Sequence, residues 1–294
     1  MAFVRNLAAP LLSRGSRGSR GSRASRAASP SSAPPSIASG STAPARTSGL
    51  SALDPLSYPA ALAGIDFARL TADLDGTFRR HGARTQPVPA DLALHHARSG
   101  FASIATFVLE GDFIARAVVS HVRVAPFFTG VAITVHPHAT IDAPLLVADL
   151  MVLPPGSSRA FLDACGPAIG RAGFATRFLE PLAAIVDGAT GVGKTTVPAW
   201  IAPLSGGNGA RLRASRGAGE KLARVVTRYV DRYLAALATA PRAVDPAANA
   251  ATVRTVRDVM RAHGPAQKHL SRAFGESFTS SYMRLVWRDD ATPT

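Results

Sequence analysis

Cysteine is almost absent from this chain of 294 residues, which contains only Cys165. One thiol cannot form an intramolecular disulfide, and all-cysteine zinc or iron–sulfur sites need several thiolates. A reducing compartment is therefore expected. Long hydrophobic runs are also lacking: although the mean hydropathy is +0.12, no apolar stretch approaches the roughly 20 residues that span a bilayer. We therefore predict a chain that is not integral to a membrane.

Acidic residues are missing from the beginning of the sequence, where the first one is Asp54. The preceding residues carry seven arginines, half of the formal net charge of +14, partly in a degenerate Ser-Arg-Gly repeat over 13–24. A segment so rich in serine, alanine, proline and arginine cannot bury enough apolar surface to form a core. We predict a disordered basic leader or transit-peptide-like segment over 1–52 and one folded domain over 53–294.

Two interpretations of the leader remain open. An arginine- and serine-rich, acid-free N-terminus is typical of an organelle transit peptide, but a GC-rich genome also yields basic tails of this composition. The first predicts a plastid location in a photosynthetic eukaryote, and the second a cytoplasmic one. An RNA-binding arm is disfavoured because no aromatic residue lies between Phe3 and Tyr58 to stack on bases.

Apolar side chains recur first at helical and then at strand spacing along the rest of the chain. The positions of Phe67, Leu70 and Leu74 predict an amphipathic helix over 66–80. Apolar runs separated by turn residues then predict consecutive strands, over 101–109, 113–124, 129–135, 145–153 and 158–164. Short connections between them, including a hairpin turn at 110–112, indicate an antiparallel sheet.

Helical spacing returns after the sheet. It predicts one helix over about 219–238, a second around 253–260, and one or two more between 270 and 282. A helix, a sheet and then further helices indicate a sheet with helices packed on it, in the α+β or three-layer class.

The most prominent local motif is Gly188–Thr195, which matches the phosphate-binding loop pattern. In a nucleotide triphosphatase this loop lies between a strand and a helix whose N-terminal amides bind phosphate. The preceding residues 182–187 have strand character, but Pro198 and Pro203 leave no room for a useful helix afterwards. A glycine-rich surface loop is favoured, and nucleotide binding through Lys194 is the alternative.

Two histidines at strand spacing, His136 and His138, could present both imidazoles to a metal ion. No third ligand follows at a characteristic spacing, so no metal site is expected.

Asp149 interrupts the otherwise apolar run over 145–152. A carboxyl group there is costly to bury unless it is paired or used, and desolvation should raise its pKa. We interpret Asp149 as a proton donor, with a hydrogen-bonded structural aspartate as the alternative.

Four segments in a common order resemble the ferredoxin-dependent bilin reductases, over roughly residues 55–290. They are Asp142–Val152 with Ala160–Asp163, His136-Pro137, Val197–Trp200 followed by Ser205 and Arg213, and Leu270–Phe278 with Tyr282-Met283. The last segment is the most specific.

The resemblance implies an α/β fold, an α/β/α three-layer sandwich with a central antiparallel sheet, which encloses a linear tetrapyrrole. It also implies reduction of biliverdin IXα to a phytobilin by sequential electron and proton transfers, the work of an oxidoreductase acting on CH–CH groups. Reduced ferredoxin would supply the electrons to a chain without bound flavin or metal, because the bilin itself holds the radical.

The family's residues can be carried over to matching positions. Asp149 aligns with the central proton-donating aspartate, and His121 and His263 are candidate auxiliary donors. Arg213 is the candidate propionate ligand. The further substrate-binding candidates are Trp200, His136 and Ser205. A basic surface suits docking of an acidic ferredoxin, and we expect a monomer with no nucleic-acid partner.

The chain departs from the family at three places. Some members carry a glutamate and a histidine where spacing places Ser120 and Ala132, and an Asp or Asn where this chain has Gly264. The departures indicate a reductase of different regiochemistry or a tetrapyrrole-binding protein without the standard reaction.

Overall fold

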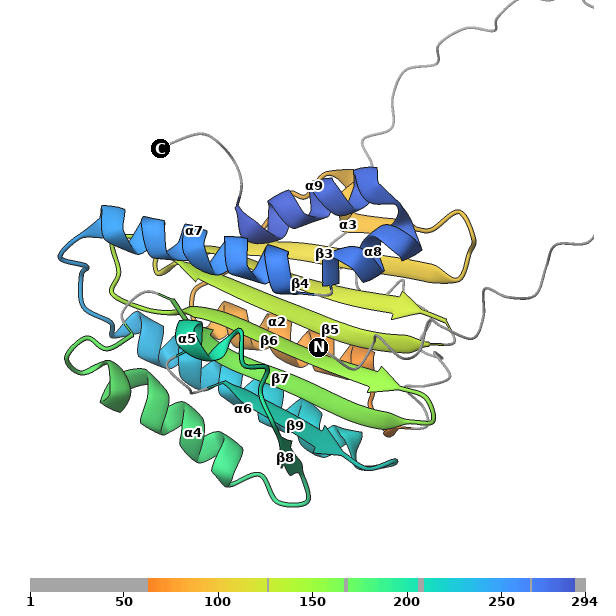
Figure 1. Cartoon of the computed structure of the whole chain (residues 1–294), viewed down its shortest axis with the longest axis horizontal. Helices are drawn as coiled ribbons and strands as arrows, with labels where there is room; N and C mark the ends of the chain where they lie inside the picture. Colours follow the sequence, from red (N-terminus) through yellow and green to blue (C-terminus); the bar gives the residue numbers. More distant parts are fainter. Residues whose placement is uncertain (1–62, 126, 167–168, 206–208, 265, 289–294) are drawn as a thin grey trace, which may run out of the picture. The chain divides into compact units, whose positions relative to one another are not determined.

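A long antiparallel sheet with helices on both faces makes up the described part of the chain (Figure 1). The computed structural model describes residues 63–125, 127–166, 169–205, 209–264 and 266–288. The predicted leader over 1–52 lies outside these ranges.

Nine strands occur in the described residues, and all paired neighbours are antiparallel. Their order across the sheet is β1-β3-β4-β5-β6-β7-β9-β8, with β2 also paired to β3. The strands are β1 (Arg84–Gln86), β2 (Leu94–His96), β3 (Ala102–Glu110), β4 (Ile114–Val124), β5 (Phe128–Pro137), β6 (Leu145–Leu153), β7 (Ser157–Cys165), β8 (Gly193–Thr195) and β9 (Ala210–Ala214).

The helices surround this sheet. They are α2 (Phe67–Arg80), α3 (Ala90–Ala93), α4 (Glu180–Asp187), α5 (Ala202–Ser205), α6 (Gly219–Ala238), α7 (Pro246–His263), α8 (Ala266–Phe274) and α9 (Glu276–Trp287), with a π-helix (Ala175–Leu179) leading into α4. Asp66 and Asp245 begin α2 and α7 by accepting hydrogen bonds from main-chain amides of the first turn, at 2.9 Å each. Among the described helices, none combines the length and apolar character needed to cross a bilayer.

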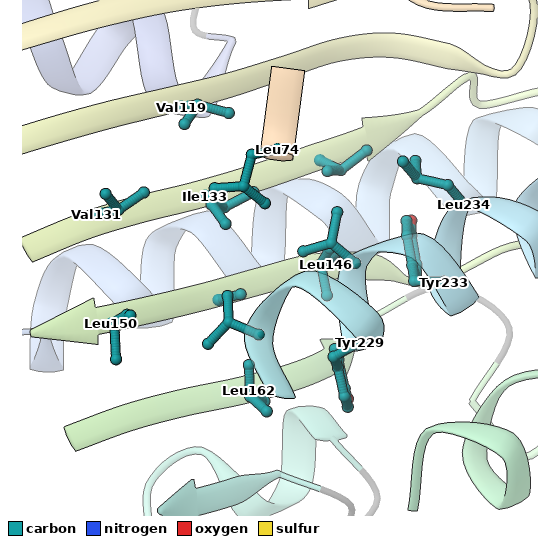
Figure 2. Packing of buried hydrophobic residues seen from close by; sticks show 14 of the residues in the cluster. Leu74, Val119, Val131, Ile133, Leu146, Leu150, Leu162, Tyr229, Tyr233 and Leu234 are labelled. Atoms are coloured by element: carbon teal, nitrogen blue, oxygen red, sulfur yellow. The ribbon is translucent and has the colours of Figure 1, made fainter. Parts of the chain in front are cut away.

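The larger core lies between the sheet and helices α2 and α6 (Figure 2). Leu146 and Leu150 of β6 point to this side and pack with Leu74 of α2 and Tyr233 of α6, all at most 1% exposed. The Tyr233 hydroxyl donates a hydrogen bond of 2.6 Å to the Pro144 carbonyl, which satisfies the buried phenol.

A second core occupies the opposite face. Leu145 and Val147 of β6 point there, because successive residues of a strand face opposite sides, and they share a cluster with Val256 of α7 and Phe278 of α9. The sheet therefore lies between two helical layers, which confirms the expected α/β/α three-layer sandwich.

The predicted core elements agree with the structure. The five expected strands correspond to β3 through β7, the helix over 219–238 is α6, and the hairpin turn closes through two hydrogen bonds between Gly111 and Ile114. Two helices, α8 and α9, fill the interval from 270 to 282.

One element was predicted wrongly: residues 182–187 form the helix α4 and not a strand. A short apolar run is compatible with either structure. Pro181 lies in the first helical turn, where its missing N–H costs nothing. Packing of Leu182 and Val186 into the core under α4 decides for the helix.

Candidate functional site

Asp149 lies on the sheet face that carries α7, α8 and α9. Its neighbours Ala148 and Leu150 belong to the core under α6, so strand alternation turns Asp149 the other way. Ala132 of β5 and Phe161 of β7 stand directly opposite it. The helical layer leaves these three side chains partly exposed. We call this side of the sheet the Asp149 face.

One cross-strand row runs through Asp149. Its members, paired in register from β3 to β8, are Thr106, Ser120, Ala132, Asp149, Phe161, Arg211 and Thr195. Ser120 and Ala132 are the positions where some members of the bilin reductase family carry a glutamate and a histidine. Both therefore lie in the same row as Asp149. Asp149 is the one carboxyl of this row.

The surroundings of Asp149 make its carboxyl group a weak acid. Burial raises its pKa from 3.8 to about 6, in the direction predicted from the sequence. Within the described residues, the structure shows no hydrogen bond or ion pair to this carboxyl. A partly exposed acid that is partly protonated near neutral pH can give a proton to a bound molecule.

Tyr282 brings a hydroxyl group from α9 to the same row. Its ring stacks on Phe278, with centroids 6.0 Å apart. Its pKa rises to about 12, chiefly through burial; the Ser120 hydroxyl opposes the rise, and the negative charge of Asp149 adds to it. Ser120 is itself hydrogen-bonded to Thr106, with 3.1 Å between the hydroxyl oxygens.

Three arginines lie on the same sheet face as Asp149, on the next two strands, β7 and β9. Arg159 of β7 stands opposite Arg213 of β9, and Arg211 stands opposite Phe161. Burial lowers the pKa of Arg159, and the charges of Arg211 and Arg213 lower it further. Like charges opposite one another destabilise a sheet, whereas a carboxylate-bearing ligand would relieve their repulsion. Of these three arginines, only Arg213 was predicted from the sequence. Arg159 could have been added, because it lies two residues before Phe161 on the same strand and therefore on the same face.

Trp200 and His263 meet at the edge of the helical layer. Their rings stack, with centroids 5.9 Å apart and an interplanar angle of 26°. Trp200 is partly buried against the second core, and His263 is exposed at the end of α7. The structure therefore brings together two of the predicted site residues that are 63 positions apart.

Two predicted substrate-binding residues are enclosed in the protein. His136 is 2% exposed, donates a hydrogen bond of 2.8 Å from Nε2 to the Val286 carbonyl, and has a pKa lowered to about 4 by burial. It connects β5 to α9. Ser205 is fully buried at the end of α5, with its hydroxyl 3.4 Å from the Ile201 carbonyl. Their proposed roles in binding stay predictions.

His121 lies on the opposite side of the sheet from Asp149. It pairs with Val131, a residue of the core under α6, and its ring stacks on Phe67 of α2 at 5.2 Å. Its Nε2 is 3.1 Å from the Thr129 hydroxyl, and burial lowers its pKa to about 4. The sheet separates His121 from the Asp149 face, so the structure does not unite this candidate donor with Asp149.

Asp163 is a second carboxyl on this face. It belongs to a segment that resembles the bilin reductases, but the sequence analysis gave it no role. It is fully buried on β7, where the Asp149 face continues beside Val147. Neither carboxyl oxygen has a hydrogen-bond partner of regular geometry in the described residues. Burial raises its pKa to about 7, and the nearby Ala164 amide opposes this only in part. The sequence could have indicated this residue, because Asp163 lies two residues after Phe161 on the same strand and therefore on the same face.

The segment Gly188–Thr195, which we call the phosphate-loop lookalike, has its secondary-structure elements in the reverse of the order that phosphate binding requires. Residues 188–192 follow the helix α4, and the last three residues of the motif form the strand β8, whereas phosphate binding needs a helix after the loop. Lys194 forms an exposed ion pair with Asp187 of α4. A cavity of about 240 Å³ nearby is lined by Leu182, Val186 and Tyr229 among others. A surface loop, the favoured interpretation, agrees with this geometry.

No cluster of three or more metal-ligating side chains is found among the described residues. The Nε2 atoms of His136 and His138 each lie within hydrogen-bond distance of a main-chain carbonyl, that of Val286 and that of Gly111.

Comparisons with known proteins rest on structure alone, because neither a family model nor a curated protein matches the sequence. The fold is similar to that of phytochromobilin synthase from tomato, solved in complex with biliverdin, with a TM-score of 0.62 and 12% identity over 77% of this chain and 84% of that one. A protein named PcyX matches with a TM-score of 0.44 and 10% identity, over 74% of this chain and 94% of that one. The chain thus has the fold of a biliverdin-binding synthase.

Proposed function

We propose that this chain binds biliverdin IXα on the Asp149 face and reduces it to a phytobilin with electrons from reduced ferredoxin. The observation that carries the proposal is Asp149: a partly exposed residue in the centre of an apolar strand, whose carboxyl has no partner in the described residues and a pKa raised to about 6 by burial. The likeness to a synthase solved with biliverdin supports the ligand class.

In this proposal each part of the face has a distinct task. Reduction of a carbon–carbon double bond consumes two electrons and two protons, and Asp149 supplies a proton at the reacting position. Arg213 and Arg211 hold the propionates of the substrate. His263, beside Trp200, remains the candidate auxiliary donor. The basic excess of the domain over 53–294, half of the formal net charge of +14, supports steering of an acidic ferredoxin, an effect that weakens with added salt.

The decisive experiment replaces Asp149 by asparagine. Asparagine keeps the size of the side chain but cannot act as an acid, so Asp149→Asn should bind biliverdin near equimolar ratio and lose about 10²-fold or more in turnover. Visible absorption spectra measure binding, and product formation with reduced ferredoxin measures turnover. The matched control is Asp112→Asn in the exposed turn between β3 and β4, for which no loss is expected.

Each outcome has a distinct meaning. Wild-type protein that binds biliverdin without reducing it would replace the proposal with a non-catalytic tetrapyrrole-binding protein. Absence of biliverdin binding would refute the proposal altogether. Turnover of Asp149→Asn at the wild-type rate would make the aspartate structural.

A further inference from the structure

A cavity of about 240 Å³ lies at the edge of the sheet that carries β8, with walls from α4, α6, β8 and β9 (Figure 1). We call it the α4 cavity. Leu182 and Val186 of α4 and Tyr229 of α6 line it, and all three belong to the larger core under α6. Its apolar walls therefore lie on the side of the sheet opposite to Asp149.

Tyr229 is a buried polar residue in the wall of this cavity. It is 2% exposed, and no hydrogen bond to its hydroxyl occurs within the described residues. Tyr233, one turn further along α6, shows the usual arrangement, because its hydroxyl donates to the Pro144 carbonyl at 2.6 Å. Burial raises the pKa of Tyr229 well above its usual value, so the phenol stays neutral. A buried hydroxyl without a partner costs free energy, and a ligand in the cavity can supply that partner.

The charges around the cavity favour an uncharged ligand. Lys194 and Asp187, which both line the cavity, form an ion pair and have 58% and 64% of their side chains exposed. Arg211 is also a lining residue, but its place in the sheet turns its side chain to the Asp149 face. A ligand carboxylate would meet a lysine whose charge is already balanced, and its burial beside Leu182 and Val186 would be costly.

The volume of the cavity limits the size of the ligand. An apolar cavity of about 150 Å³ holds a benzene molecule, so about 240 Å³ accommodates a compound of two fused rings. Pockets for drug-sized ligands measure about 300–1,000 Å³. A linear tetrapyrrole, with four rings and two propionates, is therefore too large for the α4 cavity.

We propose that the α4 cavity is a second binding site, which takes a small uncharged compound of one or two rings with a single hydrogen-bonding group. The rings of the ligand pack on Leu182 and Val186, and its hydroxyl or N–H group pairs with the hydroxyl of Tyr229. The inference goes beyond the proposed function and does not depend on it, because Asp149 lies on the other side of the sheet.

The test adds 2-naphthol to the full chain and follows the fluorescence of this probe. We expect one molecule of naphthol to bind per chain. Naphthalene, measured by displacement of naphthol, should bind about fivefold more weakly, because it lacks the hydroxyl group that pairs with Tyr229. The corresponding naphthoate should bind more weakly than either, because its carboxylate must lose its water.

Four variants locate the site. Tyr229→Phe keeps the ring and should weaken naphthol binding about fivefold, while naphthalene binding stays within about twofold of wild type. Tyr233→Phe loses a phenol hydroxyl outside the cavity and should change neither. Ala183→Phe places a ring in the cavity and should weaken naphthol binding about tenfold or more. Ala184→Phe, at the next exposed position of α4, which does not line the cavity, is its matched control.

Three results would overturn the inference. They are absence of naphthol binding, naphthol binding that neither Tyr229→Phe nor Ala183→Phe weakens, and naphthoate binding as tight as that of naphthol. Biliverdin binding should be the same in Ala183→Phe as in wild type, and its loss would contradict the separation of the two sites. If wild-type protein binds naphthol as expected but does not reduce biliverdin, the second site stands and the proposed function fails.

Discussion

The two faces of the central sheet differ in how completely they are covered. Under α2 and α6, side chains such as Ile133, Leu146 and Leu150 are at most 1% exposed and wholly apolar. On the other face, Asp149 of β6 and Phe161 of β7 remain partly exposed. Apolar burial is the main favourable term in folding. The face under α2 and α6 is therefore closed by apolar packing, while the other face combines a smaller apolar core with partly exposed polar groups.

The largest expected effect comes from removing an apolar side chain from the core under α2 and α6. Leu146→Ala removes a side chain that is fully buried in the core of Figure 2 and should lower the free energy of unfolding by about 2–5 kcal/mol. Met151→Ala, a partly exposed position of the same strand on the Asp149 face, is the matched comparison and should cost much less. Urea unfolding measures both. Equal losses would remove the proposed difference between the faces.

The second effect concerns Asp163 and depends on pH. Its pKa rises from 3.8 when unfolded to about 7 when folded, so the native state binds the proton more tightly. Its ionisation therefore costs stability, and the cost grows as pH rises from about 4 to about 7. Asp163→Asn removes this cost and should gain about 2 kcal/mol more at pH 8 than at pH 5.

Urea unfolding at the two pH values checks this prediction, with exposed Asp112→Asn as the control that should show no such pH dependence. An equal change at both pH values would show that Asp163 is ionised without cost in the folded protein.

The third effect tests the arginines of the Asp149 face. Arg213→Gln should weaken biliverdin binding about tenfold, or about 1.4 kcal/mol, because one charge-assisted contact to a propionate is lost. Binding of biliverdin dimethyl ester, which lacks both carboxylates, should not change. Arg232→Gln, on the exposed side of α6, is the control. Equal weakening of acid and ester would contradict a role in propionate binding.

The smallest effect is expected at the phosphate-loop lookalike. Lys194 and Asp187 are 58% and 64% exposed, and such a surface ion pair contributes at most about 1 kcal/mol. Lys194→Ala should therefore alter stability only slightly, and Mg-ATP should not raise the melting temperature of either protein. Stabilisation by Mg-ATP that disappears in Lys194→Ala would restore the nucleotide-binding alternative.

Local sequence patterns identified much of this architecture. Alternation of apolar residues located β3 through β7, and helical spacing located α2 and α6. The same patterns marked Asp149, because a carboxyl in an apolar strand stands out against its neighbours. The pattern did not distinguish a helix from a strand at 182–187, where only packing under α4 decides.

The sequence by itself determined which segments form the central strands and the long helices, because those signals repeat every two or 3.6 residues within one segment. Only the tertiary structure decided which side chains meet. It placed His121 on the sheet face opposite to that of Asp149, brought Arg159 opposite Arg213, and stacked the ring of Trp200 on that of His263. These partners lie on different segments, and register and helix docking follow from the burial of whole faces rather than from any local pattern.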